Sequence, residues 1–216
     1  MEIDRISALL SPFLEEPLSA LQLEHISIYV DTLLRWNARI NLTALRTPEE
    51  IVTRHFGESF FLARHLFPHK FKEKSTGKGG RVLDIGSGAG FPGLPLKIWN
   101  QEMNLTMIES NHKKATFLRE VVRTLGLDDV VVKTDRAEEL ARDPGFPRSD
   151  FVTFRAVENF EKILNLAVTF LVPGGRLTLL LGASQSESLR EVSSVRWEDP
   201  ILVPQSHSRI LAMGSI

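Results

Sequence analysis

The chain has no cysteine among its 216 residues, and this absence excludes several kinds of chemistry. Without cysteine there are no disulfides, no thiolate nucleophiles and no cysteine ligands for a metal. No metal site is predicted. Long hydrophobic runs are also missing, because no stretch approaches the roughly 20 apolar residues that span a bilayer. The segment Met1–Arg5 lacks the basic and apolar regions of a signal peptide, and we expect a cytoplasmic protein with no membrane partner.

A strong overall charge is missing too, since the formal net charge is −1. The charge is nevertheless uneven along the chain. Residues 1–34 hold six acidic residues and one basic residue, whereas residues 35–78 hold nine basic and four acidic residues. Such a local basic band can contact phosphates even on a nearly neutral protein. A solvated helix face followed by a lysine-rich linker explains the same pattern, and both interpretations stay open.

Hydrophobic residues make up 43% of the chain and charged residues 25%, which is typical of a globular protein. Helical spacing of apolar residues predicts a helical amino-terminal extension over residues 1–69, with a helix start at Thr47-Pro48 and Glu50 placed for a capping box. A polar, glycine-containing linker is predicted over 70–80 and a second domain over 81–216. The balanced charge and modest apolar content are compatible with a monomer.

Strands and helices alternate from residue 81 onwards. This alternation predicts an α/β fold with a doubly wound, mostly parallel sheet of seven strands. The expected strands are residues 81–85, 105–109, 130–134, 151–156, 176–182, 201–203 and 209–213. The expected helices are residues 92–99, 112–125, 136–142, 159–171 and 184–195, with a turn at 173–175.

The first strand runs into a glycine-rich turn that fits two cofactor classes. The acid Asp84 is followed by Gly86, Gly88 and Gly90, as in the loop of S-adenosylmethionine (SAM) methyltransferases. Gly88, Gly90 and Gly93 also match the dinucleotide fingerprint of nicotinamide enzymes. An acid two positions before the first glycine favours SAM, a cation without phosphates. A nicotinamide site and a purely structural turn remain alternatives.

Charged residues follow the next strands. Glu109 ends the second strand, where an acid can accept both ribose hydroxyls of either cofactor. The segment 135–139 places carboxylates after the third strand, where one can meet an adenine amine. Arg155 ends the fourth strand, and ligands bind at the carboxyl ends of such strands. Asn41 is best explained from the residues alone as a helix cap, and His55 and His65 as structural residues or part of the basic band.

Several of these segments together resemble one family. The chain resembles the RsmG (GidB) family of bacterial SAM-dependent methyltransferases of small-subunit ribosomal RNA, and the similarity runs nearly from end to end. The loop that ends in Phe91-Pro-Gly-Leu-Pro-Leu96 is its most specific part. The matching segments are residues 36–44, 54–55, 82–96, 113–118, 136–138, 155–156 and 171–175.

The resemblance implies methylation of guanine N7 in the 530-loop region of 16S ribosomal RNA, with S-adenosylhomocysteine as the product. It implies SAM contacts at the glycine loop, after the third strand and at the end of the fourth. The matching residues here are Gly86, Phe91, Ala137, Glu138 and Arg155. By their position, Asp84, Ser87, Gly88, Gly90 and Glu109 are expected to join them as cofactor-binding residues. Substrate handling is implied for Asn41, Arg136, Arg155 and Arg209. Two departures from the family pattern are Phe154, where relatives often carry a small polar residue, and the order His207-Ser-Arg209.

The implied chemistry agrees with what the chain lacks. Guanine N7 carries a lone pair and no proton, so its attack on a sulfonium methyl group needs no general base. Pyrimidine C5 methylation uses a cysteine nucleophile, which is absent. The arginines are therefore expected to position groups. RNA-backbone contacts are expected from Arg35, Arg39, Arg46, Lys70, Lys72 and Lys74, with 16S ribosomal RNA or the small subunit as the partner. A protein or small-molecule methyltransferase and, less favoured, a nicotinamide-dependent oxidoreductase are the alternatives.

Overall fold

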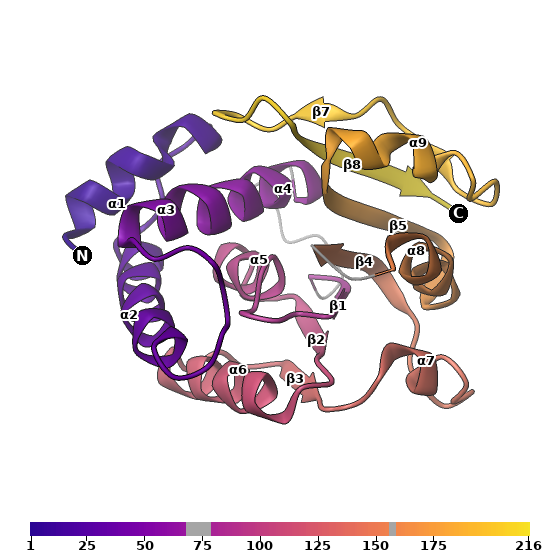
Figure 1. Cartoon of the computed structure of the whole chain (residues 1–216), viewed down its shortest axis with the longest axis horizontal. Helices are drawn as coiled ribbons and strands as arrows, with labels where there is room; N and C mark the ends of the chain where they lie inside the picture. Colours follow the sequence, from indigo (N-terminus) through magenta and orange to yellow (C-terminus); the bar gives the residue numbers. More distant parts are fainter. Residues whose placement is uncertain (68–78, 156–158) are drawn as a thin grey trace.

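The computed structural model describes residues 1–67, 79–155 and 159–216, and one mixed sheet lies at its centre (Figure 1). Within these ranges the sheet has eight strands in the order β3-β2-β1-β4-β5-β8-β6, with β7 also paired to β8. The first five strands are parallel, and β6 and β7 run antiparallel to β8, which is itself antiparallel to β5. The strands are β1 (Arg81–Ile85), β2 (Asn104–Ile108), β3 (Val130–Lys133), β4 (Ser149–Arg155), β5 (Leu171–Gly182), β6 (Arg196–Trp197), β7 (Ile201–Leu202) and β8 (Arg209–Ser215).

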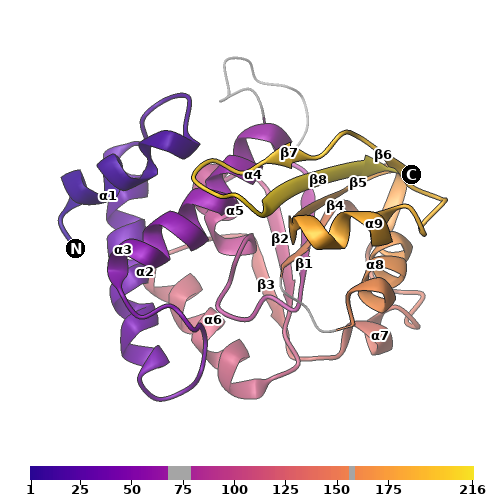
Figure 2. The same ribbon diagram turned by 45° about the horizontal axis from the view of Figure 1, so that its top comes forward.

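Helices cover both faces of the sheet, which confirms the predicted doubly wound α/β architecture (Figure 2). One face packs against α5 and α6 and against the amino-terminal helices, and the other against α7, α8 and α9. The helices are α1 (Ile3–Leu10), α2 (Ala20–Asn37), α3 (Pro48–Ile51), α4 (Glu58–Leu66), α5 (Gly93–Trp99), α6 (His112–Thr124), α7 (Ala137–Leu140), α8 (Phe160–Thr169) and α9 (Ser186–Leu189). Shorter turns are the 3₁₀ segments η1 (Ser11–Phe13) and η3 (Ala183–Gln185) and the π-helical η2 (Val52–Gly57).

The amino-terminal helices share one apolar core with the sheet. Tyr29 of α2 and Phe56 of η2 are fully buried in the same cluster as Leu94 of α5, Phe117 of α6 and Leu211 of β8. The predicted amino-terminal extension (1–69) and the predicted second domain (81–216) therefore pack directly against each other on this face of the sheet. The predicted linker at 70–80 lies outside the described residues except for Gly79 and Gly80.

Local sequence signals explain where the long amino-terminal helices begin. Ser19 caps α2 and forms a capping box with Gln22. Thr47 caps α3, accepting from the backbone N–H of Glu50 at 3.3 Å, and Pro48 fills the first helical position as predicted. A loop joins the end of α2 to the start of α3. No helix in the described part of the chain is long and apolar enough to cross a membrane.

Three elements near the carboxyl terminus differ from the prediction. The helix expected over 184–195 shrinks to η3 and α9, because its serines bond backbone groups locally, as Ser186 does to the Ala183 carbonyl at 2.7 Å. The turn expected at 173–175 lies inside β5 as an irregularity, where pairing with β4 jumps from Leu171 to Arg176. The predicted count of seven strands was wrong, because the two-residue β6 adds an eighth.

Candidate functional site

The loop between β1 and α5 lies at the carboxyl edge of the parallel strands. Its backbone N–H groups at Gly86 and Ser87 both donate to the Ile108 carbonyl, at 2.8 and 3.1 Å, which ties the loop to the end of β2. Gly90 has a φ of 87°, and a Cβ there would lie 2.3 Å from the Tyr29 hydroxyl. A side chain at position 90 therefore fits neither the backbone conformation nor the space.

Glu109 follows β2 and fixes the loop from its other side. Its Oε2 accepts from the Gly88 N–H at 2.9 Å and its Oε1 from the Asn111 N–H at 2.8 Å. Glu109 is 7% exposed and borders a cavity. Because each carboxylate oxygen accepts only one of these hydrogen bonds, each keeps a lone pair for a ligand. Glu109 is the acid for which the sequence predicted contacts with the ribose hydroxyls of a cofactor.

A cavity of about 360 Å³ opens at the carboxyl ends of β1, β2 and β3. Of the predicted cofactor and substrate residues, the following line it: Gly86, Glu109, Arg136, Ala137 and Glu138. Glu138 pairs with Lys162 of α8 at 2.8 Å, and this contact lowers the pKa of the Glu138 carboxyl. Asp135, one of the carboxylates of the segment 135–139, also lines the cavity, and so does Lys114, which was not selected from the sequence.

Asp84 lies beneath the loop and does not line this cavity. It is fully buried, its Oδ2 accepts from the Gly93 N–H at 3.3 Å, and its Oδ1 has no partner among the described residues. Burial raises the pKa of Asp84 to about 7. Ser87 is buried as well, and its hydroxyl donates to the Asp84 carbonyl at 3.0 Å. In this arrangement the Asp84 carboxylate braces the turn through its contact with the start of α5.

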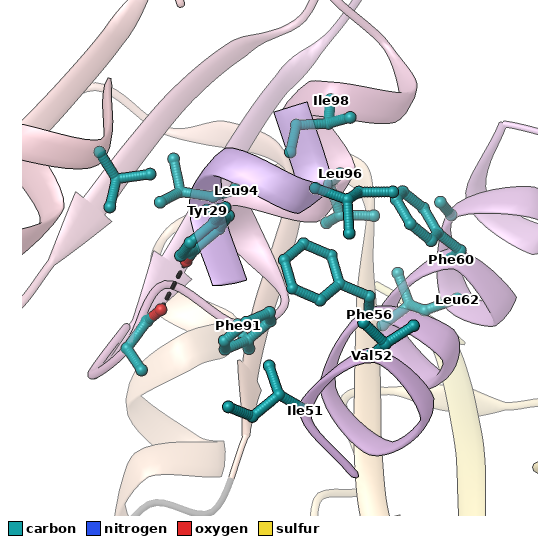
Figure 3. Packing of buried hydrophobic residues seen from close by; sticks show 14 of the residues in the cluster. Tyr29, Ile51, Val52, Phe56, Phe60, Leu62, Phe91, Leu94, Leu96 and Ile98 are labelled. Carbon is teal, nitrogen blue, oxygen red and sulfur yellow. Dashed lines mark hydrogen bonds between the residues drawn. The ribbon is translucent and has the colours of Figure 1, made fainter. Parts of the chain in front are cut away.

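Phe91 anchors the loop in an aromatic stack from the amino-terminal helices (Figure 3). Its ring stacks on Tyr29 with centroids 5.4 Å apart and on His55 with centroids 4.5 Å apart. Phe56 meets it edge-on at 5.1 Å. The Tyr29 hydroxyl donates to the Ala89 carbonyl at 2.5 Å. Phe91 is 6% exposed and lies outside the cavity wall, so it holds the loop from behind.

His55 is a neutral member of this stack. Burial, with the charges of Arg155, Arg54 and Arg209, lowers the pKa of His55 to about 2. Its Nε2 lies 2.8 Å from the hydroxyl of Thr43, which connects it to the loop that follows α2. Of the two interpretations given to His55 from the sequence, the structural one is correct.

Arg155 and Arg209 meet at a residue that the sequence did not single out. The Oε2 atom of Glu58, at the start of α4, lies 3.1 Å from a guanidinium nitrogen of each arginine. Glu58 is 4% exposed. The sequence signal that could have identified Glu58 is an acid among the apolar positions of a helix. Its partners could not be identified in the same way, because they lie 97 and 151 residues further along the chain. Phe154 points to the opposite face, where it packs edge-on against Phe160 at 5.7 Å.

The expected substrate residues lie around the same edge. Gln22, near the start of α2, bonds the Ile98 carbonyl at the end of α5, so α2 runs from the amino edge of the sheet toward the carboxyl edge. Three predicted RNA contacts, Arg35, Arg39 and Arg46, are exposed at its far end and in the following loop. Asn41 is exposed in that loop and caps no helix; Thr47 does so. Lys70, Lys72 and Lys74 lie outside the described residues.

Comparison with known proteins gives a consistent assignment. The family model described as rRNA small subunit methyltransferase G matches residues 22–199. Proteins named Ribosomal RNA small subunit methyltransferase G from Desulfitobacterium hafniense and Dictyoglomus thermophilum are 39% and 37% identical to this chain. The matches cover 81% and 84% of this chain and 69% and 70% of those proteins.

Solved structures with low sequence identity share the fold. A SAM-dependent methyltransferase from Aquifex aeolicus superposes with a TM-score of 0.53 at 18% identity, covering 66% of this chain and 85% of that one. A ribosomal protein L11 methylase from Lactobacillus delbrueckii subsp. bulgaricus gives 0.56 at 14% identity, covering 74% and 79%. In fold, the chain is a Rossmann-like SAM-dependent methyltransferase. By its family match and its close relatives, it belongs to the GidB family of small-subunit ribosomal RNA methyltransferases.

Proposed function

We propose that this protein transfers a methyl group from SAM to N7 of a guanine in the 530-loop region of 16S ribosomal RNA. The observation that carries the proposal is the meeting of the glycine loop, Glu109 and the 360 Å³ cavity at the carboxyl edge of the sheet in a chain of this family. The family match favours SAM over the nicotinamide cofactor that the glycine loop also fitted.

The residues around the cavity suit the groups of SAM. Glu109 keeps a free lone pair on each oxygen for the ribose hydroxyls, and Glu138 offers a carboxylate beside the position proposed for the adenine amine. Gly86 brings bare backbone to the cavity wall. SAM supplies a methyl group on a sulfonium sulfur. Asp84, Ser87, Gly88, Gly90 and Phe91 support this site by fixing the loop.

Positioning supplies the remaining catalysis. N7 needs no base, and the buried histidine beside the loop stays neutral at physiological pH, so it is not a proton donor there. The protein must hold the guanine in line with the methyl group, which is worth several kcal/mol of the barrier. We assign Asn41, Arg136, Arg155 and Arg209 to this task. An unpaired or flipped guanine suits such a site.

The exposed arginines at the end of α2 and in the loop that follows support an RNA surface beside the cavity. Arg35, Arg39 and Arg46 are the described members, and Lys70, Lys72 and Lys74 extend the set along the chain. Replacing Arg35, Arg39 and Arg46 by alanine should flatten the dependence of log K on log salt by about 0.7 per lost phosphate contact. An unchanged slope would show that these arginines are a solvated surface that does not contact RNA phosphates. We infer a monomer that acts in the cytoplasm, where ribosomes assemble.

The direct test is methyl transfer from labelled SAM onto small subunits and 16S RNA that lack the modification, followed by mapping of the labelled nucleotide. Incorporation at a single guanine N7 is expected, with no incorporation into RNA that already carries the methyl group. Label in ribosomal protein or in small molecules would support the alternative methyltransferase class. No label in RNA, from protein that binds SAM, would reject the proposal.

A further inference from the structure

A second cavity, of about 270 Å³, lies between the amino-terminal helices and the turn from β7 to β8. Thr53 and Arg54 of η2 and Glu58 line one side, and residues 204–209 line the other. Figure 2 shows the β7–β8 turn passing over this end of α4. The cavity is smaller than the roughly 300–1,000 Å³ of small-molecule sites, so it suits a single compact group.

Charge in and behind this cavity is unbalanced. Among the described residues, Glu58 is the one carboxylate that Arg155 and Arg209 contact, and the charge of Arg54 lowers the pKa of Arg155. These four side chains carry a net charge of +2. Burial, reinforced by Arg209 and Arg54 and opposed by Glu58, lowers the pKa of Arg155 to about 10. Surplus positive charge in a buried setting is stabilised by an anion.

Donors for an anion are also left over. Nε of Arg209 and Nη1 of Arg155 are buried and have no hydrogen-bond partner in the part of the chain that the structure describes. Arg54 is exposed at the mouth of the cavity. Guanidinium groups match the geometry of phosphate oxygens, to which they can donate two parallel hydrogen bonds. A phosphodiester carries one negative charge. It would reduce the surplus positive charge while Arg155 and Arg209 keep their contacts with Glu58.

The cavity shares an edge with the proposed methyl-transfer site. Ile85 of β1 pairs with Phe154 of β4, so Arg155 is level with Gly86, the first residue of the glycine loop. Arg209 pairs with Gly182 at the end of β5. The SAM cavity therefore lies on the β1–β3 side of Arg155, and the second cavity on the β5–β8 side.

We propose that this second cavity binds one backbone phosphate of the RNA, next to the guanine that is methylated. Arg54 and Arg209 contact the phosphate, and Glu58 is a positioning residue that orients Arg155 and Arg209. This inference rests on the proposed function, because it assumes an RNA substrate at the neighbouring site.

The test combines a protein variant with an RNA in which one charge is removed. Arg54→Ala is suitable because Arg54 is exposed, and Arg123→Ala is the matched control, an exposed arginine near the end of α6, at the opposite edge of the sheet. RNA is made with an uncharged methylphosphonate at each linkage flanking the target guanine in turn. Affinity is measured over a range of salt, and SAM affinity by calorimetry.

We expect Arg54→Ala to bind RNA about tenfold more weakly, with a salt slope lower by about 0.7, and to bind SAM normally. One methylphosphonate should weaken binding to the wild type and to Arg123→Ala but add little to the loss in Arg54→Ala. Full sensitivity of Arg54→Ala to every methylphosphonate, or an unchanged salt slope, would overturn the inference while methylation by the wild type continues. Failure of the proposed function would appear differently, as absence of RNA methylation by the wild type.

Glu58 is tested separately through kinetics. Glu58→Gln keeps the shape but removes the charge that both arginines share, so the KM for RNA should rise several-fold while the affinity for SAM is unchanged. Glu58→Asp should restore part of the loss. A fall in thermal stability with an unchanged KM for RNA would reduce Glu58 to a structural residue and overturn its positioning role.

Discussion

The hydroxyl of Tyr29 donates a 2.5 Å hydrogen bond to the carbonyl of Ala89, across 60 residues of sequence. Tyr29 is the only tyrosine in the chain and is fully buried. Its ring stacks on Phe91 in the same loop, so one side chain of α2 fixes two points of the glycine turn. The proposed SAM site thus depends on a helix that does not line it.

Replacing Tyr29 by phenylalanine tests this dependence. The variant keeps the stack but leaves the Ala89 carbonyl buried without its donor, which costs about 1–3 kcal/mol of unfolding free energy. We expect weaker SAM binding in calorimetry together with a lower melting temperature. Leu189→Ala, in the core on the other face of the sheet, is the control: it should lower the melting temperature without changing SAM affinity. Normal SAM binding by the Tyr29 variant would contradict the dependence.

Two glycines with positive φ allow a matched comparison in the backbone. Gly90 has a φ of 87° and a crowded Cβ position, whereas Gly126 has a φ of 58° and nothing within 4 Å. Gly126→Ala should cost only the strain of a left-handed alanine, about 1–2 kcal/mol. Gly90→Ala adds a clash with Tyr29 and Leu94, so its loss of stability should be larger and its SAM binding should be severely weakened. Equal melting temperatures for the two variants would show that the loop can move aside.

Asp84 should make stability depend on pH in an unusual direction. Its pKa is about 7 in the folded chain against an ordinary value of 3.8, so between these values the folded state holds a proton that the unfolded state has lost. The contribution of Asp84 to unfolding free energy therefore falls as pH rises from about 4 to 7, by at most about 1.4 kcal/mol per pH unit, and is constant above.

Asp84→Asn removes this dependence while keeping the side-chain shape. Melting temperatures of the variant and the wild type, measured from pH 4 to 9, should diverge in favour of the variant up to about pH 7 and then run parallel. His55 has a lowered pKa in the folded state, so its own contribution to stability rises with pH. This contribution is the same in both proteins and cancels when their melting temperatures are subtracted. A difference that does not vary with pH would contradict the raised pKa.

Glu109→Gln tests the proposed ribose contact. Glutamine has one acceptor oxygen where the carboxylate has two. Its NH₂ group must therefore face the N–H of either Gly88 or Asn111, which is unfavourable. The substitution also removes a charged acceptor for the ribose hydroxyls of SAM. We expect SAM affinity to fall by about 10- to 100-fold. Glu139→Gln, exposed on α7, is the control and should bind SAM normally. Normal SAM affinity in Glu109→Gln would place the ribose elsewhere.

Short-range signals in the sequence predicted the elements that position the site. Alternating apolar runs located β1 to β4, and Thr47-Pro48 located the start of α3. The glycines and Glu109 were found because their roles depend on neighbours a few residues away along a strand-loop-helix unit. Serine-rich residues 184–195 misled the prediction, because local side-chain bonds compete with a helix there.

Long-range pairing could not be predicted from the sequence. Glu58, Arg155 and Arg209 come from α4, β4 and β8, and only the folded sheet brings them together. Phe91 was selected as a cofactor contact, but whether it faces a ligand or a core depends on α2 and η2, which pack behind it. Asp84 was selected from its place before the glycines, but its complete burial beneath the loop depends on the tertiary fold.

The core shared between the amino-terminal helices and the sheet also limits how the protein can be dissected. A fragment beginning at residue 79 would leave Leu94, Phe117 and Leu211 without the side chains that now cover them. Large uncovered apolar areas favour aggregation. Removing the first helices to isolate a minimal catalytic module would therefore yield an insoluble product instead of a simpler enzyme.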